Sequence, residues 1–289
     1  MSHMENESKL SVGIIGAGWV GQPLAEVLFS AGHNVIATTT SSEKVADIES
    51  TGARAELLQL PLNESQSQEP HFVFSQDILI IAIPPQIKHG KTDYPEKIRQ
   101  IVTRASASGT KRIVMISTTA VYNGLSGEVD ETMPLDFDSP KVAILSEAEN
   151  AVLAFSGNSV VLRLAGLIGP KRHPARFIKS PRLLANGGIA VNLIHLDDVI
   201  GLLLASTEPN APSGIFNGVA NTHVSKETFY QAAASAAGEE LPVFAKNDAS
   251  EGSKVILGGK AERELNFNLE HPDLIKWLAT EKPQISNDS

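Results

Sequence analysis

The chain contains no cysteine among its 289 residues. A disulfide framework and a thiolate metal site are therefore excluded, and the absence fits a reducing compartment. Long apolar runs are also missing, because no stretch approaches the ~20 residues that a membrane-spanning helix needs. The N-terminus lacks the basic flank and apolar stretch of a signal peptide. We therefore expect a cytoplasmic protein that does not bind a membrane.

Basic residues are scarce. The chain has 24 Lys and Arg against 33 Asp and Glu, a formal net charge of −9. This balance disfavours a nucleic-acid partner, since such proteins need a basic face to displace counterions from phosphates. One local basic cluster stands out, and its members are Lys171, Arg172, His173, Arg176 and Lys179. A small anionic ligand suits so short a cluster better than a polymer does.

Apolar, β-branched runs alternate with longer amphipathic segments over most of the chain. The expected strands are Ser11–Ile15, Asn34–Thr38, Asp77–Ile83, Lys111–Ser117, Ser159–Leu164 and Gly214–Val219, with a weaker one at Glu56–Leu60. The expected helices are Gln22–Ala31, Ser42–Glu49, Tyr94–Ser108, Val142–Phe155, Asp197–Ser206 and Lys226–Ala237. Such alternation predicts an α/β fold of the Rossmann type, a doubly wound parallel sheet with helices on both faces.

Two segments rich in Pro, Gly and basic residues interrupt the alternation of predicted strands and helices. We therefore expect a dinucleotide-binding domain over 10–168, to which 196–220 return. A smaller C-terminal substrate lobe is expected from 169–195 and 221–283. The polar ends, 1–9 and 284–289, are expected to be flexible tails.

A glycine-rich loop, Gly16-Ala-Gly18-Trp-Val-Gly21, directly follows the first strand and precedes the first helix. In dinucleotide-binding proteins the first glycine permits the tight turn, the second admits the pyrophosphate, and the third packs helix on strand. The helix N-terminus then faces the anion. The other interpretation is a tight turn without a ligand.

The second strand ends in hydroxyl residues where an acidic residue usually binds the adenosine ribose. Here the segment contains Thr38, Thr39 and Thr40, with Lys44 nearby. Hydroxyls and an ammonium suit a 2′-phosphate, so we expect NADP, with NAD as the alternative. The remaining residues expected at the cofactor are Trp19 and Val20 in the loop and Ile83 and Pro84 after the central strand.

Several segments together resemble the extended and atypical short-chain dehydrogenase/reductase superfamily, which contains NAD-dependent epimerases and dehydratases. These segments are "RIVMISTTAVYNG" (112–124), "VDETMPLDFDSP" (129–140), "VVLRLAGLIGP" (160–170), "NLIHLDDVIGLLLAS" (192–206) and "GIFNGVAN" (214–221). The resemblance implies a small-molecule substrate that is anionic or a nucleotide-sugar. It also implies a homodimer through the helices near 94–108 and 142–155.

The family's catalytic set consists of a Ser or Thr and a Tyr-x-x-x-Lys pair. Thr118 matches the Ser/Thr position, whereas Lys141 stands where the Tyr would fall and Leu145 where the Lys would fall. The chain's three tyrosines, at 94, 122 and 230, have no Lys four residues later. A phenol with a pKa near ~10 needs a nearby cation to act as a base at neutral pH. The usual hydride-transfer machinery is thus altered.

The sequence also departs from the family's pattern at residues expected to bind the cofactor. The glycine spacing is one residue shorter than the family's usual spacing, and an Asp that commonly contacts adenine is replaced around Leu60-Pro61.

Lys141 is either a base whose pKa is lowered by burial or a solvated lysine. Tyr122 lies either near the cofactor or in a supporting loop position.

Two sets of polar residues beyond the sixth predicted strand each have two possible interpretations. Arg172, His173 and Arg176 are expected to contact the substrate, or else to form a solvated loop. His195 and Asp197 suggest a metal site, but the segment offers too few ligands, so we expect no metal and a helix-capping Asp197.

Two functions remain open. One is an NADP-dependent, epimerase/dehydratase-like oxidoreductase with Thr118, Tyr122 and Lys141 as catalytic candidates. The other is a non-catalytic NADP(H)-binding regulator or redox sensor.

Overall fold

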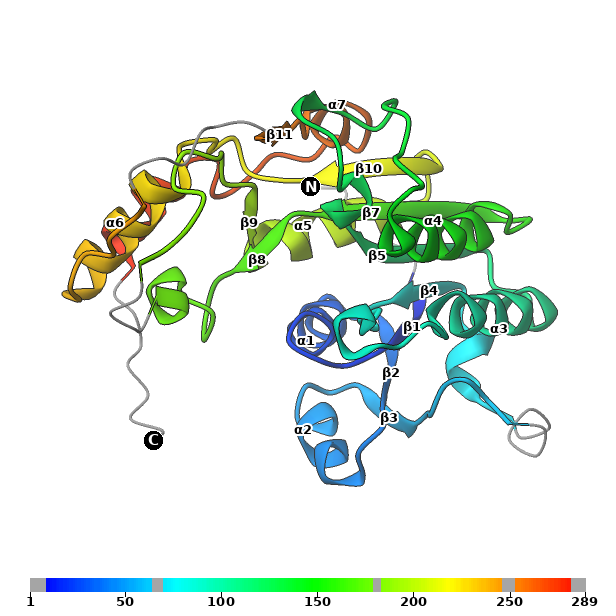
Figure 1. The fold of residues 1–289 in the computed structure, drawn as a ribbon. Coiled ribbons are helices and arrows are strands. Elements are labelled where there is room, and N and C mark those ends of the chain that lie inside the picture. The colour runs from blue at the N-terminus through cyan, green and yellow to red at the C-terminus, as the bar shows by residue number, and fades with distance from the viewer. Residues whose placement is uncertain (1–8, 64–69, 179–182, 246–252, 282–289) are drawn as a thin grey trace, which may run out of the picture. The chain divides into compact units, whose positions relative to one another are not determined.

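The computed structural model describes residues 9–63, 70–178, 183–245 and 253–281 (Figure 1). Lys179 of the predicted basic cluster and nearly all of the two predicted tails lie outside these residues. Among the described residues, no helix is both long enough and apolar enough to cross a membrane.

The chain forms two compact units. The first comprises 1–116, 144–161 and 212–214, and the second comprises 117–143, 162–211 and 215–289. These bounds differ from the predicted ones, because residues 117–143 belong to the second unit although the sequence places them in the nucleotide-binding domain.

A seven-stranded sheet has the order β10-β7-β5-β4-β1-β2-β3. Its strands are β1 (Ser11–Ile15), β2 (Asn34–Thr39), β3 (Arg54–Leu57), β4 (Ile78–Ile81), β5 (Arg112–Thr118), β7 (Asn158–Leu164) and β10 (Gly214–Gly218). Within the first unit the pairs are parallel, with Val12 opposite Val35 of β2 and Ile78 of β4. The predicted doubly wound α/β fold is thereby confirmed.

The helices also follow the predicted alternation. They are α1 (Gly21–Ser30), α2 (Val45–Glu49), α3 (Tyr94–Ser108), α4 (Pro140–Leu153), α5 (Leu196–Thr207), α6 (Lys226–Ala237), α7 (Gly259–Glu264) and α8 (Leu274–Thr280). Short 3₁₀ turns are η1 (Ser42–Lys44), η3 (Phe72–Ser75), η4 (Ile87–His89), η5 (Thr119–Tyr122) and η6 (Pro174–Ile178). The sequence missed α7, α8 and all the strands outside the main sheet, because these elements are short and have little periodicity.

The chain reverses direction across the sheet between β1 and β4. From β1 it proceeds through α1, β2 and α2 to β3, whereas from β4 it proceeds through α3 to β5 on the other side. Right-handed crossovers then put α1 and α2 on one face and α3 on the other (Figure 1). In such sheets, ligands bind outside the carboxyl ends of the strands at this point of reversal.

The core of the first unit explains why β4 reads as an uninterrupted apolar run. All four residues Ile78–Ile81 are buried, as a central strand covered on both faces requires. Helix α1 buries Leu24 and Leu28, which lie one helical turn apart on one face.

The second unit contains two small parallel pairs, β8 (Gly166–Ile168) with β9 (Leu193–His195) and β6 (Gly127–Val129) with β11 (Lys254–Ile256). A separate apolar core joins α6 to α8. Its buried members are Ile168, Val191, Ala220, Phe229, Ala233, Leu274, Trp277 and Leu278. The second unit thus has an apolar core of its own.

The close packing of α1 on the glycine loop yields a stability prediction. A Cβ on residue 21 would collide with the Gly16 carbonyl oxygen, so we expect Gly21→Ala to lower the free energy of unfolding by about 1–3 kcal/mol. Gly18→Ala is the matched control, since a Cβ there meets nothing within 4 Å. Chemical denaturation of both variants measures the difference, and equal stabilities would contradict the packing.

Candidate functional site

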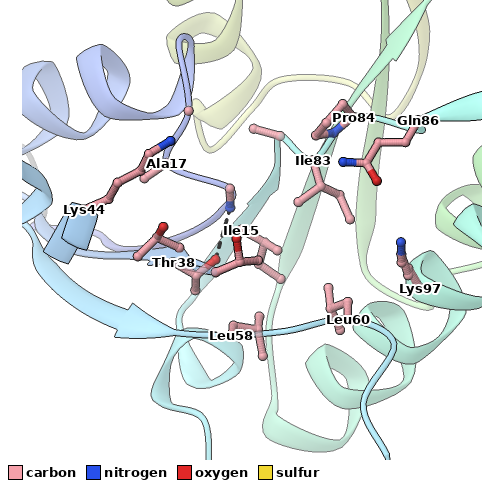
Figure 2. A pocket seen from close by; sticks show the side chains of 15 residues that line it. Ile15, Ala17, Thr38, Lys44, Leu58, Leu60, Ile83, Pro84, Gln86 and Lys97 are labelled. Atoms are coloured by element: carbon pink, nitrogen blue, oxygen red, sulfur yellow. Dashed lines mark hydrogen bonds between the residues drawn. The ribbon is translucent and has the colours of Figure 1, made fainter. Parts of the chain in front are cut away.

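A cavity of about 390 Å³ lies in the first unit, within the size range of small-molecule sites (Figure 2). Its walls come from the turns after β1, β2 and β4, from the segment after β3 and from α3. The lining residues are Ile15, Gly16, Ala17, Gly18, Thr38, Thr39, Thr40, Lys44, Leu58, Leu60, Ala82, Ile83, Pro84, Gln86 and Lys97. The cavity therefore lies at the carboxyl edge of the sheet, where the chain reverses.

The glycine loop is tied to the end of β2. The Gly16 amide donates to Thr38 Oγ1 at 3.1 Å, and the Ala17 amide donates to the Thr38 carbonyl at 2.8 Å. Gly16 has a φ of +102°, which L side chains rarely adopt, so glycine suits this turn. The loop is thus held in one conformation beside Thr38.

The start of α1 leaves room for an anion. Val20, the N-cap residue, provides no side-chain hydrogen bond to the first turn, and Gly18 is exposed with open space in the direction of a Cβ. Unsatisfied amides at a helix start carry a partial positive charge. This end of the cavity can accept a phosphate.

The end of β2 presents hydroxyls and one cation. Thr38 and Thr39 are buried, whereas Thr40 and Lys44 are exposed. Lys44 and Lys97 lie on opposite sides of the cavity (Figure 2), and Lys97 forms an ion pair with Asp93 at 3.1 Å. No Asp or Glu is among the described residues that line the cavity. The lining therefore favours an anionic ligand.

Most of the expected cofactor residues line this cavity, but three do not. Trp19, Val20 and Gly21 are absent from the lining, since Val20 begins α1 and Gly21 packs against the Gly16 carbonyl. The lining residues that the sequence did not predict are Ile15, Ala17, Leu58, Ala82, Gln86 and Lys97. Leu60 lies where the sequence lacks the Asp that commonly contacts adenine. Leu58 and Leu60 follow the weak strand signal at 56–60, whereas Lys97 on α3 has no local signal.

Thr118 and Tyr122 lie at the two ends of η5 in the second unit. Thr118 is half-buried and its Oγ1 accepts a hydrogen bond from the Ala120 amide at 3.2 Å. The hydroxyl proton of Thr118 remains available for a hydrogen bond to a substrate oxygen.

Tyr122 is completely buried, which corrects the expectation of a catalytic role. Its hydroxyl donates to Asn217 Oδ1 at 2.8 Å and accepts from Arg163 Nη1 at 2.9 Å. The Arg163 guanidinium also lies 4.9 Å from the centre of the Tyr122 ring. Burial raises the pKa of the phenol, so it holds its proton at neutral pH. A hydroxyl engaged in this way supports the core and does not reach a substrate.

Lys141 is half-buried and has a neighbour that the sequence did not identify. Lys254 Nζ donates to the Tyr122 carbonyl at 3.0 Å, and to Asn123 Oδ1 at 3.4 Å. Burial, and then the charge of Lys141, lower the pKa of Lys254. The two ammonium groups therefore share one neighbourhood close to η5. No local pattern marks Lys254, which begins β11.

The predicted substrate residues of the basic loop separate into two groups. Arg172 and Arg176 are exposed, and Arg176 Nη1 donates to the Lys171 carbonyl at 3.0 Å. His173 is buried, its Nδ1 accepts from the Ala175 amide at 3.3 Å, and burial lowers its pKa. The expected substrate contact of His173 is thus corrected to a position inside the lobe.

The start of α5 also differs from expectation. The capping residue is His195, whose Nδ1 accepts from the Asp197 amide at 3.2 Å, and not Asp197. His195 is buried, and this burial lowers the pKa of its imidazole to about 4. Asp197 lies exposed in the first turn, where a negative charge favours the helix.

The sheet order, the glycine loop and the cavity beside it are those of a dinucleotide-binding fold. The chain belongs to the NAD(P)H-binding family, whose model matches residues 16–192.

Relatives cover nearly the whole chain. Protein YeeZ of Escherichia coli K12 is 34% identical over 266 residues, which are 91% of this chain and 96% of the relative. A functionally unknown conserved protein from Silicibacter pomeroyi has a TM-score of 0.76 at 25% identity, covering 93% of this chain and 97% of its own. MoeE5 in complex with UDP-glucose and NAD has a TM-score of 0.74 at 19% identity, covering 93% and 96%.

The position of Tyr122 predicts a structural effect. Tyr122→Phe removes the hydroxyl that accepts from Arg163 Nη1 and donates to Asn217 Oδ1, so we expect the free energy of unfolding to fall by about 1–3 kcal/mol. Tyr230→Phe is the matched control, because no hydrogen bond of its hydroxyl occurs among the described residues. Urea unfolding compares the two, and a Tyr122→Phe protein as stable as the control would refute the supporting role.

Proposed function

We propose that the protein is an NADP(H)-dependent oxidoreductase of the epimerase/dehydratase-like type, acting on a small anionic or nucleotide-sugar substrate. The observation that carries this proposal is the cavity at the carboxyl edge of the sheet, formed by the glycine loop, the three threonines and Lys44. MoeE5, which shares the fold, binds NAD and UDP-glucose.

The glycine loop provides the pyrophosphate subsite in this proposal. The exposed Gly18 lets a ligand approach the backbone, and the start of α1 lacks a side-chain cap that would compete for its amides. Leu58 and Leu60 offer an apolar wall for adenine in place of a polar residue that would read it.

The preference for NADP rests on charge. A ribose 2′-hydroxyl is usually bound by a carboxylate, which would repel a 2′-phosphate. The described cavity lining contains no carboxylate, while Thr39 at the end of β2, Thr40 after it and Lys44 at the end of η1 all line the cavity. An ammonium and hydroxyls form charge-assisted hydrogen bonds to phosphate oxygens.

Bound NADPH would supply a hydride to a carbonyl carbon, and the carbonyl oxygen then needs a proton. Thr118 can hold that oxygen through its hydroxyl, because only its acceptor side is engaged with the Ala120 amide. Lys141 and Lys254 are the cations close to η5 that would donate the proton, and Lys254 Nζ lies 3.0 Å from the Tyr122 carbonyl oxygen.

A second function has one observation in its favour. The hydroxyl of Tyr122 is committed to the core, and Lys141 occupies the family's Tyr position. A protein that binds NADP(H) and reports its redox state to a partner would need the cavity but no proton donor.

The cofactor proposal is tested at Gly18. A Cβ at this position meets nothing within 4 Å, so for Gly18→Val we expect an intact fold but a loss of NADPH binding, because the side chain would fill the path of the pyrophosphate. Isothermal titration of wild-type, Gly18→Ala and Gly18→Val proteins measures this loss. A well-folded Gly18→Val protein with wild-type affinity would exclude the loop as the phosphate site.

Lys44 tests the choice of cofactor. A charge-assisted hydrogen bond contributes about 1.5–3 kcal/mol, so Lys44→Ala should weaken NADPH binding by ~10–100-fold and leave NADH binding unchanged. Lys276→Ala, at a side chain that is 85% exposed in the second unit, is the matched control. An equal loss for both cofactors would argue against a 2′-phosphate contact.

A further inference from the structure

Three potential metal ligands that the proposed function does not use meet in the second unit. His195 and Asp197 stand at the start of α5, and His271 comes from the segment before α8. Asp197 Oδ2 lies 3.3 Å from His195 Nδ1 and 3.2 Å from His271 Nε2, and all three ligand atoms lie within 4.8 Å of one another. The fold thus supplies the third ligand that the sequence segment lacks.

The contact between His195 and Asp197 brings two potential metal-ligand atoms together. His195 Nδ1 accepts the Asp197 amide proton, so this nitrogen carries a lone pair and faces the carboxylate oxygen as a second acceptor. His271 Nε2 lies 3.2 Å from the same Asp197 oxygen. A metal ion among the three atoms would be coordinated by both imidazoles and the carboxylate.

The geometry points to a site for a divalent first-row metal, with Zn²⁺ as its occupant, formed by His195, Asp197 and His271. Tetrahedral ligands at about 2.0–2.2 Å from zinc are separated by about 3.3–3.5 Å, close to the two short distances here. When zinc binds, His195 Nδ1 would coordinate the metal and would no longer accept the hydrogen bond from the Asp197 amide. The fourth position faces solvent, because Asp197 is 46% and His271 22% exposed on their side chains.

Neighbouring residues hold the ligands in place. Asp198 is buried, and its Oδ1 accepts from the amides of Glu270 and His271, which fixes the segment that carries the third ligand. The Trp277 ring lies 4.8 Å from the His195 ring, centre to centre. Zinc would therefore link the start of α5 to the segment before α8. This site is independent of dinucleotide binding.

The experiment uses the full chain after chelation, titrated with ZnCl₂. We expect one zinc per chain in the wild-type protein. His271→Ala should weaken the affinity by more than ~100-fold, beyond the usual loss for a residue that only supports a ligand. His89→Ala, at an exposed histidine of the first unit, is the matched control and should bind as wild type. Circular dichroism of each variant verifies the fold.

A second readout places the metal. In a Trp19→Phe background Trp277 is the single tryptophan, so bound Co²⁺ should quench its fluorescence and Asp197→Asn should reduce the quenching. Zinc that does not bind, or that binds equally to His271→Ala, would overturn the proposal. Binding that leaves Trp277 unquenched by Co²⁺ would do so as well.

Discussion

The paired hydrogen bonds from the loop amides of Gly16 and Ala17 to Thr38 hold the candidate cofactor site together. They join the turn after β1 to the end of β2, at the edge of the sheet where the chain reverses. Because Gly16 adopts a positive φ and Gly21 packs on its carbonyl, α1 starts directly at this edge. The same residue, Thr38, anchors the loop and lines the cavity, so fold and binding site depend on one contact.

The second unit shows a different use of polar groups. Arg163 is buried and donates to the hydroxyl of Tyr122, which in turn donates to Asn217. A buried guanidinium is tolerable only when it is hydrogen-bonded, so this chain of contacts constrains the phenol to a supporting role. Near η5, burial and the charge of Lys141 lower the pKa of Lys254. The first unit thus contains the candidate cofactor cavity, whereas the Tyr122 hydroxyl in the second unit supports the core.

The sequence predicts well what depends on local pattern. The strands of the main sheet and their helices follow from periodicity, and the glycine loop follows from its place between strand and helix. Long-range contacts leave no such trace. His271 reaches Asp197 across 74 residues, and Lys254 reaches Tyr122 across 132, so neither could be placed from spacing. Tyr122 and His173 were misjudged because sequence position indicates proximity to a site but not whether a side chain is buried.

Amide hydrogen exchange with and without NADPH tests most directly whether the dinucleotide occupies this edge of the sheet. The account predicts that NADPH slows exchange in residues 16–21 and 38–44, where the loop and the end of β2 border the cavity. Exchange in α6, which belongs to the separate core of the second unit, should serve as the internal reference. Unchanged exchange in both segments at saturating NADPH would contradict the account.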